Sequence, residues 1–345
     1  MKRVLIKNPN EICLEEIPDP SPGFGEIKLQ IAYCGICGSD LHAYRGKHPF
    51  ISLPATPGHE FSGRIVEIGE GVDEGDKSFE VGQRVTCEPS LVCGQCYLCK
   101  TGRYNICENL RVMGCQAEGA MAEYLIVPAE KVVPIPEELS LKYAVLVEPL
   151  AVAIHAVRKS KINIGDNVVI LGAGTIGLFL LQIAKLAGAK NIIVTDIQEK
   201  RLALAKDLGA TRVINAAEED PVRILLKEKP FEGWEIVFEA VGIETTMQQA
   251  LDIVRKGGKI IVVGVFGAET TTIMKNVQDR ETEIIGTLMY VMRDIKDAID
   301  LITSRKVKVE SLITSVYKLE QAEKAFKTAF DTQNQLKVIF EINPS

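Results

Sequence analysis

The stretch Asn167-Val168-Val169-Ile170-Leu171-Gly172-Ala173-Gly174-Thr175-Ile176-Gly177 decides the fold of this 345-residue chain. Its first five residues form a short apolar run, which is typical of a strand buried on both faces. A glycine-rich turn follows, and the residues from Ile176 to Leu186 have the apolar spacing of a helix. The stretch therefore predicts a strand, a tight turn and a helix in direct succession.

The turn carries the pattern G-x-G-x-x-G, which is weak evidence alone but strong evidence between a strand and a helix. Gly172 can make the tight turn, Gly174 can let a pyrophosphate approach, and Gly177 can let the helix pack closely on the strand. Thr175 and Ile176 would open the helix, whose N-terminus would face the phosphates. These residues predict a dinucleotide-binding site.

Asp196 ends the next expected strand, roughly 20 positions after Gly177. A carboxylate there can accept hydrogen bonds from the adenosine ribose and would repel a 2′-phosphate, which favours NAD over NADP. Arg201 would either flank the adenine or be a solvated helix residue, and the sequence leaves both readings open.

Strands and helices continue to alternate after this motif. Strands are expected at 191–195, 235–238, 259–263 and 283–286, with helices at 200–208 and 245–254. The alternation predicts an α/β domain with a doubly wound parallel sheet, a Rossmann domain, over 151–286. The remaining residues are expected to add helices at 293–303 and 319–328 and a strand at 335–340.

Residues 1–150 have a different sequence pattern, with short apolar runs broken by proline and glycine, as at 19–23 and 53–58. Short apolar runs separated by turn residues predict a mainly β domain. Residues 287–345 are expected to pack back onto it and complete it. Two domains also suit a chain longer than one hydrophobic core usually serves.

The composition excludes several classes of function. A formal net charge of −6 disfavours a nucleic-acid partner, which would need clustered Lys and Arg. With no apolar signal region and no run of about 18 apolar residues, the sequence predicts a cytoplasmic protein without membrane association. Nine cysteines in such a chain favour metal or catalytic roles over disulfides.

Four cysteines have the spacing C-x2-C-x2-C-x7-C: Cys93, Cys96, Cys99 and Cys107. Four thiolates around one Zn²⁺ leave no open coordination position, so such a zinc would be structural. An iron–sulfur cluster is the main alternative, but the last cysteine comes late and is not followed by proline. Cys13, Cys34, Cys87 and Cys115 lack ligand spacing and are predicted to be small buried residues.

A second set of candidate ligands combines Cys37, which opens C-G-S-D-L-H, with His59 and Glu60 in G-H-E. One thiolate, one imidazole and one carboxylate suit an open zinc site. Glu148, at the end of the first domain, would complete the coordination sphere or exchange with it. Each of these residues taken singly would more simply be a buried or paired side chain.

The ordered motifs resemble those of the zinc-containing medium-chain dehydrogenases, which include alcohol, sorbitol, butanediol and threonine dehydrogenases, over essentially the whole chain. The resemblance implies a GroES-like catalytic domain, completed by the C-terminal segment, with the Rossmann domain between. It implies that Cys37, His59, Glu60 and Glu148 surround a catalytic zinc, so that two Zn²⁺ bind per subunit. It also favours a homotetramer over a dimer.

Ser39 and His42 stand two and five places after Cys37, where residues of this family relay the substrate proton. A bound Zn²⁺ makes an alcohol a stronger acid. Ser39 would then take the proton of a secondary alcohol and pass it through the nicotinamide ribose to His42, while hydride moves to NAD⁺.

Two details bear on the substrate. Glu148 lies in E-P-L, where simple alcohol dehydrogenases carry a cysteine, and this resembles enzymes of polyols, diols, sugar acids and threonine. Met289 stands where sorbitol-type enzymes have arginine, which argues against sorbitol itself. L-threonine 3-dehydrogenase and 2,3-butanediol dehydrogenase remain alternatives. Many butanediol enzymes, however, lack a complete set of the four cysteines found at 93, 96, 99 and 107, here called the four-cysteine lobe.

Two functions from other classes compete with this interpretation. A zinc-free reductase of the same superfamily would not need Cys37, His59 and Glu148 together. A non-catalytic zinc-binding protein would need only the four-cysteine lobe and would leave Ser39 and His42 unexplained.

Overall fold

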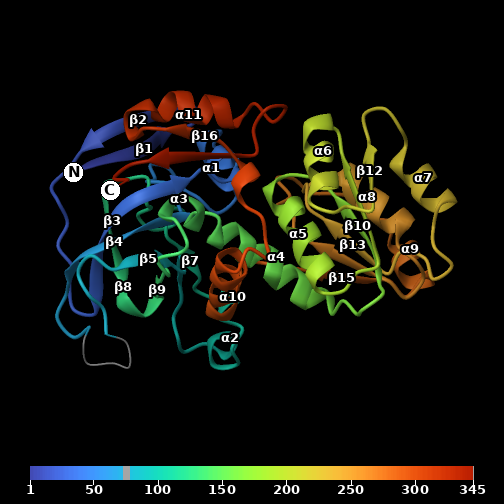
Figure 1. The fold of residues 1–345 in the computed structure, drawn as a ribbon, viewed down its shortest axis with the longest axis horizontal. Coiled ribbons are helices and arrows are strands. Elements are labelled where there is room, and N and C mark those ends of the chain that lie inside the picture. The colour runs from blue at the N-terminus through green and yellow to red at the C-terminus, as the bar shows by residue number, and fades with distance from the viewer. Residues whose placement is uncertain (73–77, 345) are drawn as a thin grey trace. The chain divides into compact units, whose positions relative to one another are not determined.

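A computed structural model describes residues 1–72 and 78–344. The chain divides into two compact units, Met1–Glu148 with Val291–Ser345 and Pro149–Tyr290. The first unit is formed by the two ends of the chain, drawn from blue to green and from orange to red in Figure 1, and the second by the middle. No helix within the described residues is long and apolar enough to cross a membrane.

The second unit is built on a six-stranded sheet with the order β12-β11-β10-β13-β14-β15, and every neighbouring pair is parallel. The strands are β10 (Asn167–Leu171), β11 (Asn191–Asp196), β12 (Arg212–Asn215), β13 (Ile236–Glu239), β14 (Lys259–Val262) and β15 (Glu283–Gly286). All five residues of β10 are buried, as expected for a central strand of a parallel sheet. The sheet confirms the predicted doubly wound α/β fold class.

Helix α4 (Val147–Ser160) precedes β10, and the strands are connected by α5 (Thr175–Leu186), α6 (Glu199–Asp207), α7 (Pro221–Lys227), α8 (Glu244–Ile253) and α9 (Met274–Asp279). The sequence predicted α5, α6 and α8 but missed β12, α4, α7 and α9. β12 is an edge strand in which only Ile214 is fully buried, so it lacks an apolar run. Asp220 caps α7 by accepting from the amides of Val222 and Arg223.

The first unit contains a seven-stranded sheet with the order β16-β17-β3-β4-β5-β9, in which β8 also pairs with β3. The strands are β3 (Glu26–Gly35), β4 (Phe61–Ile68), β5 (Arg84–Cys87), β8 (Tyr124–Pro128), β9 (Val132–Pro134), β16 (Ile313–Tyr317) and β17 (Lys337–Glu341). β17 runs antiparallel to β3, so strands from both ends of the chain share one sheet. Along the first part of β3, burial alternates, and Ile27, Leu29 and Ile31 enter the core.

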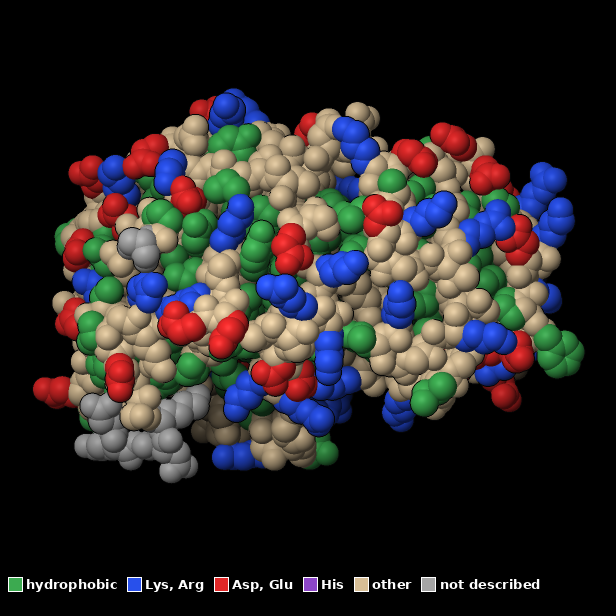
Figure 2. Space-filling view, viewed as in Figure 1, with side chains coloured by type: hydrophobic (Ala, Val, Ile, Leu, Met, Phe, Trp, Pro, Cys, Tyr) green, Lys and Arg blue, Asp and Glu red, His purple; other side chains and the backbone are tan. Residues whose placement is uncertain are grey.

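Smaller elements complete this unit. Two further sheets pair β1 (Lys2–Asn8) with β2 (Glu11–Glu16) and β6 (Ser90–Leu91) with β7 (Arg111–Val112). The helices are α1 (Gly38–Tyr44), α2 (Tyr97–Lys100), α3 (Leu141–Ala144), α10 (Met292–Thr303) and α11 (Ala322–Ala329). The predicted helix at 319–328 begins with a separate 3-10 turn, η4 (Leu319–Gln321). On the face shown in Figure 2, acidic and basic side chains are interspersed.

Candidate active site

Three potential metal ligands converge in the first unit: Cys37 directly before α1, and His59 and Glu60 directly before β4. Their ligand atoms all lie within 4.8 Å of one another. His59 and Glu60 are buried and Cys37 is half-buried, so the set is more accessible to solvent at Cys37 than at the other two residues. Glu148, the fourth predicted residue, lies at the start of α4 and is not a member of this set.

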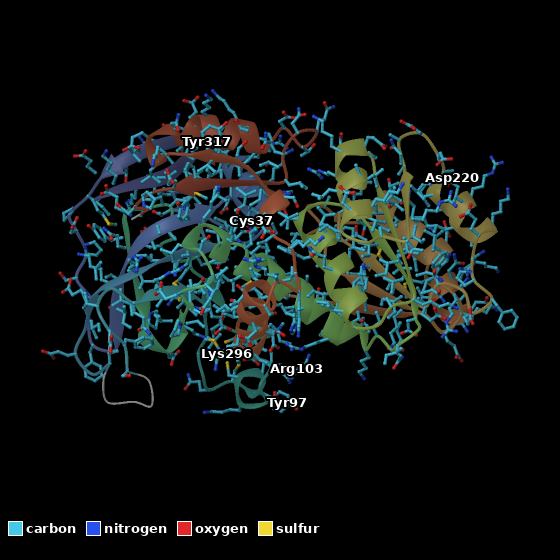
Figure 3. All side chains as sticks on the ribbon, viewed as in Figure 1. Cys37, Tyr97, Arg103, Asp220, Lys296 and Tyr317 are labelled. Carbon is cyan, nitrogen blue, oxygen red and sulfur yellow. The ribbon has the colours of Figure 1, made fainter. Side chains whose placement is uncertain are left out.

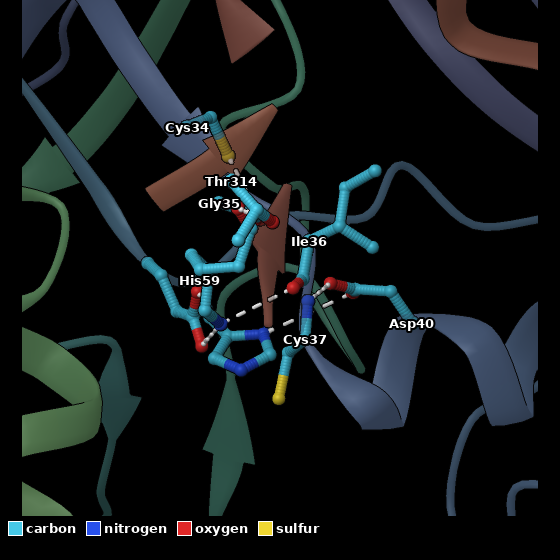
Figure 4. A network of polar contacts seen from close by, with 9 residues as sticks. Cys34, Gly35, Ile36, Cys37, Asp40, His59 and Thr314 are labelled. Carbon is cyan, nitrogen blue, oxygen red and sulfur yellow. Dashed lines mark hydrogen bonds and ion pairs between the residues drawn. The ribbon is translucent and has the colours of Figure 1, made fainter. Parts of the chain in front are cut away.

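The set is held in place by Asp40, which the sequence analysis did not select. Its Oδ2 accepts a hydrogen bond of 2.8 Å from the Cys37 amide at the N-terminus of α1. Its Oδ1 lies 3.9 Å from Nδ1 of His59, and both contacts are drawn in Figure 4. Burial raises the pKa of Asp40, although His59 and the Cys37 amide oppose this shift. One buried carboxylate therefore accepts a hydrogen bond from Cys37 and lies at ion-pair distance from His59, although Oδ1 of Asp40 and Nδ1 of His59 make no hydrogen bond.

Glu60 is paired with Lys337, the first residue of β17. The Lys337 ammonium donates to Oε1 of Glu60 at 2.7 Å and to Oε2 at 2.6 Å, and also to the Ile36 carbonyl at 3.2 Å. Both side chains are almost completely buried. Burial lowers the pKa of Lys337, but Glu60, Cys37 and Glu148 outweigh burial and raise it. The carboxylate of Glu148 is thus close enough to act on this cation.

The two proposed relay residues lie on α1. The Oγ atom of Ser39 is buried and has no hydrogen-bond partner, whereas the His42 side chain is exposed. Residues three apart on a helix are neighbours on its surface. A buried hydroxyl without a partner, two residues after Cys37, and an imidazole open to solvent suit a path for a proton.

Cys115 also reaches the set, which the sequence analysis did not expect. Burial lowers the pKa of His59, but Cys37 outweighs it together with hydrogen bonds to the thiols of Cys115 and Cys37, and the pKa is raised well above its ordinary value. Cys34 and Cys87 are buried as predicted, but the prediction was wrong for Cys13 and Cys115, which are half-buried.

The four cysteines of the lobe form a second potential metal site. All four sulfurs lie within 4.8 Å of one another, and none is in a disulfide: Cys93, Cys96, Cys99 and Cys107. Backbone amides of Gln95 and Cys96 donate toward Cys93 and lower its pKa to about 6. Thiolates stabilised by amides are suitable ligands for zinc. Tyr97 and Arg103, labelled in Figure 3, belong to the same lobe.

The glycine-rich turn of the second unit has the geometry that its sequence predicts. Gly172 has a φ of +103°, in the region that favours glycine. A Cβ on Gly177 would lie 1.9 Å from the Gly172 carbonyl oxygen, so close packing requires glycine there. The nearest atom to a Cβ on Gly174 would be Nη1 of Arg201 at 4.0 Å, which leaves the loop open to a ligand. Thr175 and Ile176 open α5 and are half-buried.

Asp196 lies against this turn at the end of β11. Its Oδ2 accepts from the Ala173 amide at 2.7 Å and its Oδ1 from the Gln198 amide at 2.9 Å. Nη1 of Arg201 lies 4.0 Å from the same Oδ2, and the Arg201 side chain is only 17% exposed. The predicted dinucleotide-binding residues therefore form one continuous group in the second unit.

Comparisons with known proteins agree with this geometry. Residues 23–137 match the alcohol dehydrogenase GroES-like domain, and residues 175–304 match the zinc-binding dehydrogenase family. The chain is 35% identical to sorbitol dehydrogenase of Bacillus subtilis, with 98% of this chain and 96% of that protein covered.

Two solved structures are also similar. A protein from Sinorhizobium meliloti 1021, described as a zinc-binding dehydrogenase bound to NADP, has a TM-score of 0.88 at 30% identity, with 99% of this chain and 98% of that chain covered. An alcohol dehydrogenase from Escherichia coli CFT073, complexed with NADH, has a TM-score of 0.90 at 32% identity, with 99% of both chains covered.

The class of zinc-type dehydrogenases is defined by a β-rich unit with a Cys/His/Glu cluster and, between its two segments in the chain, a parallel-sheet unit with a glycine-rich turn. The chain belongs to the zinc-containing medium-chain dehydrogenase family and is an oxidoreductase of the alcohol dehydrogenase type.

Proposed function

We propose that the protein is a zinc-dependent, NAD-linked dehydrogenase that oxidises a secondary alcohol of a polyol, diol or sugar acid to a ketone. The observation that carries this proposal is the convergence of Cys37, His59 and Glu60, and the hydroxyl of Ser39, two residues after Cys37, is buried and has no hydrogen-bond partner. The sorbitol dehydrogenase relative supports a polyol-type substrate. L-threonine and 2,3-butanediol remain the alternatives that the position of Met289 leaves open.

Cys37, His59 and Glu60 would hold the catalytic Zn²⁺, and Glu148 would exchange into its coordination sphere. The donor set fits this ion because it combines a thiolate, an imidazole and a carboxylate. Asp40, beside Nδ1 of His59, leaves the other ring nitrogen for the metal. When bound, the ion supplies Lewis acidity, which makes the hydroxyl of the substrate a stronger acid.

The protein groups would then move the proton. Ser39 would accept it from the substrate hydroxyl, because its Oγ is buried and has no competing partner, and would pass its own proton through the nicotinamide ribose to His42. His42 exchanges it with water from the exposed face of α1. Such positioned proton transfer typically contributes about 10²–10⁴-fold to a rate.

The cofactor would bind along Gly172, Gly174 and Gly177, with Asp196 on the adenosine ribose. Asp196 favours NAD because its carboxylate would repel a 2′-phosphate. Arg201 lies beside Asp196, and its positive charge could pair with the 2′-phosphate of NADP. Binding of NADP should therefore be compared with that of NAD. The similar structures include one with each cofactor.

We also propose that the lobe of four cysteines holds a structural Zn²⁺, which makes two ions per subunit. Residues 1–150 with 287–345 would form the catalytic domain and residues 151–286 the cofactor domain. A homotetramer is the assembly that the family resemblance favours.

The test combines a substrate panel with metal analysis. Purified protein is incubated with NAD⁺ or NADP⁺ and with polyols, butanediol stereoisomers, threonine or aldonates, and reduced cofactor is followed by absorbance. We expect NAD-dependent turnover of one substrate group that a zinc chelator abolishes. Cys37→Ser should lose turnover and one of two zinc ions, while Cys13→Ser, outside both clusters, should keep both. Full turnover by Cys37→Ser would contradict the proposal.

A further inference from the structure

Glu239 is a buried carboxylate at the end of β13, and the proposed function gives it no role. The residue is 0% exposed. Its Oε1 accepts from the Val241 amide at 3.0 Å, the Gly242 amide at 2.8 Å and the Thr246 hydroxyl at 2.7 Å. Its Oε2 is buried and has no hydrogen-bond partner. Three donors thus satisfy one oxygen, while the other oxygen is left without any.

No positive charge balances Glu239. Within residues 1–72 and 78–344, no lysine or arginine forms an ion pair with it. Neither of its oxygens donates a hydrogen bond, which is the pattern of an ionised carboxyl group. Amides and a hydroxyl supply dipoles but no full charge, and a buried charge is costly unless it is paired. A buried anion without a cation suits a site that a positively charged ligand completes.

Glu239 lies at the edge of the sheet where such a ligand is expected. Sheets of this kind bind dinucleotides outside the carboxyl ends of their strands, across the point where the strand order reverses. Here that point lies between β10 and β13. Asp196 ends β11 on one side of it and would hold the adenosine half, so the nicotinamide half would lie on the side of β13, β14 and β15. Glu239 is the last residue of β13 and lies at the carboxyl edge on this side.

Two chain segments pack against the Glu239 carboxylate. A Cβ on Gly264, which follows β14, would lie 2.6 Å from Oε2 of Glu239. A Cβ on Gly242, which follows β13, would lie 2.5 Å from the Val265 carbonyl oxygen. Each segment also exposes an apolar side chain, Val241 at 42% and Val265 at 58%. A flat ring resting on these valines would lie within reach of the charge of Glu239, because little solvent would separate the two.

We propose that Glu239 is a specificity-determining residue that favours the oxidised cofactor over the reduced one. This inference rests on the proposed function. The nicotinamide ring of NAD⁺ is positively charged and becomes neutral when it accepts a hydride from the alcohol, whose hydroxyl proton leaves separately. A fixed negative charge beside the ring therefore stabilises NAD⁺ but not NADH. The consequence is that NADH is held less tightly once hydride transfer is complete.

The experiment measures cofactor binding by calorimetric titration and needs no substrate. The ligands are NAD⁺, NADH, ADP-ribose, which lacks the ring, and an NAD⁺ analogue with a benzamide ring joined through carbon in place of nicotinamide. The benzamide ring is flat, like that of NAD⁺, but uncharged. Comparing these four ligands separates the effect of the ring charge from that of the adenosine half.

The proteins are wild type, Glu239→Gln, Glu239→Asp and Glu235→Gln. Glu239→Gln keeps the size of the side chain and one accepting oxygen but removes the charge, whereas Glu239→Asp keeps the charge. Glu235→Gln is the matched control, because Glu235 directly precedes β13 at the opposite end of the same strand. Its carboxylate accepts from the amide and the side chain of Asn167.

The ratio of the dissociation constants of NADH and NAD⁺ should fall at least about fivefold in Glu239→Gln and change less than about twofold in Glu235→Gln. Glu239→Asp should stay closer to wild type than Glu239→Gln does. ADP-ribose should bind all four proteins within about twofold, because it has no ring to interact with the charge. Wild type should prefer NAD⁺ to the uncharged analogue by a factor similar to the first, and this comparison tests the inference even if Glu239→Gln does not fold.

A ratio that is the same in wild type and Glu239→Gln would overturn the inference and leave the proposed function standing. An equal loss of affinity for NAD⁺, NADH and ADP-ribose would also overturn it, because Glu239 would then only maintain the shape of the turn. Equal binding of NAD⁺ and the uncharged analogue to wild type would have the same meaning. If wild type binds neither NAD⁺ nor ADP-ribose, the proposed function and this inference fail together.

Discussion

Asp40 shows how much of the candidate site depends on a single side chain. It accepts from the Cys37 amide and lies 3.9 Å from Nδ1 of His59, so it contacts two proposed ligands that come from different segments of the chain. Partners of metal-binding histidines orient the imidazole ring and set which nitrogen carries the proton. Cys37 and His59 would therefore be less well placed without Asp40.

Asp40→Asn should lower affinity for the catalytic zinc by about 10- to 100-fold, because the amide cannot supply the negative charge beside His59. The measurement is chelator competition for the second zinc ion. Asp220→Asn is the matched control, since Asp220 also caps a helix but lies in the second unit. Equal zinc affinity in wild type and Asp40→Asn would refute this role.

Tyr33 gives a pH-dependent contribution to stability. Burial, together with the hydrogen bond and charge of Glu341, raises the pKa of Tyr33 to about 12. Because the folded pKa lies above the unfolded value near 10, the contribution is complete below about pH 10 and is lost as pH rises toward 12. Denaturant unfolding of wild type and Tyr33→Phe should therefore differ by a constant amount up to about pH 10 and converge above it. Convergence already near pH 8 would contradict the assignment.

At the scale of elements, two glycines in the turn between β10 and α5 meet different requirements, one of close packing and one of open space for a ligand. Gly177 has no room for a Cβ because of the Gly172 carbonyl, whereas Gly174 has open space and a φ of −69°. The two glycines serve different purposes although they belong to one pattern. Gly177 lets the helix pack closely on the strand, and Gly174 leaves open the space in which we propose that the cofactor phosphates bind.

Gly177→Ala should therefore destabilise the protein, and Gly174→Ala should leave stability nearly unchanged but weaken cofactor binding by tenfold or more. Thermal unfolding and calorimetric titration with NAD⁺ separate the two effects. If Gly174→Ala binds NAD⁺ as tightly as wild type, the cofactor does not approach the turn at that residue.

The elements that the sequence predicted well are those with strong local patterns. The apolar run of β10 and the glycine turn were readable because the evidence lies within a few adjacent residues. β12 was missed because an edge strand needs few apolar residues. Lys337 was missed for another reason: its partner Glu60 lies far away in sequence, and only the pairing of β17 with β3 brings the two ends together.

The ligand set shows the same limit. Spacing indicated Cys37, His59 and Glu60, but could not show that Asp40 or Cys115 reaches His59. That Glu148 takes part in metal binding remains a proposal, because it is not one of the three residues whose ligand atoms lie within 4.8 Å of one another. Side chains that act through other side chains have no sequence signature of their own.

At the scale of the whole molecule, the two units differ in how the chain builds them. The second unit, Pro149–Tyr290, is one continuous segment with its own sheet and its own buried cluster around Val169, Val237 and Ile260. The first unit needs both ends of the chain. A continuous unit with its own core is expected to fold independently.

A fragment of residues 147–290 should therefore fold cooperatively, bind NAD⁺ and contain no zinc. Circular dichroism on heating, calorimetry and metal analysis test these three points. A fragment that shows no cooperative unfolding would mean that the second unit depends on the first for its stability.

The contribution of β17 to the first unit has a consequence for protein synthesis. Cys37, His59 and Glu60 are synthesised long before Lys337 and the strand that pairs with β3. Until Lys337 and β17 emerge, the nascent chain therefore carries Glu60 without its counter-ion and β3 without one of its neighbours. Unpaired strand edges of this kind invite aggregation and engagement by chaperones. A chain that stopped before Lys337 would thus contain all three candidate metal ligands but lack the counter-ion of Glu60.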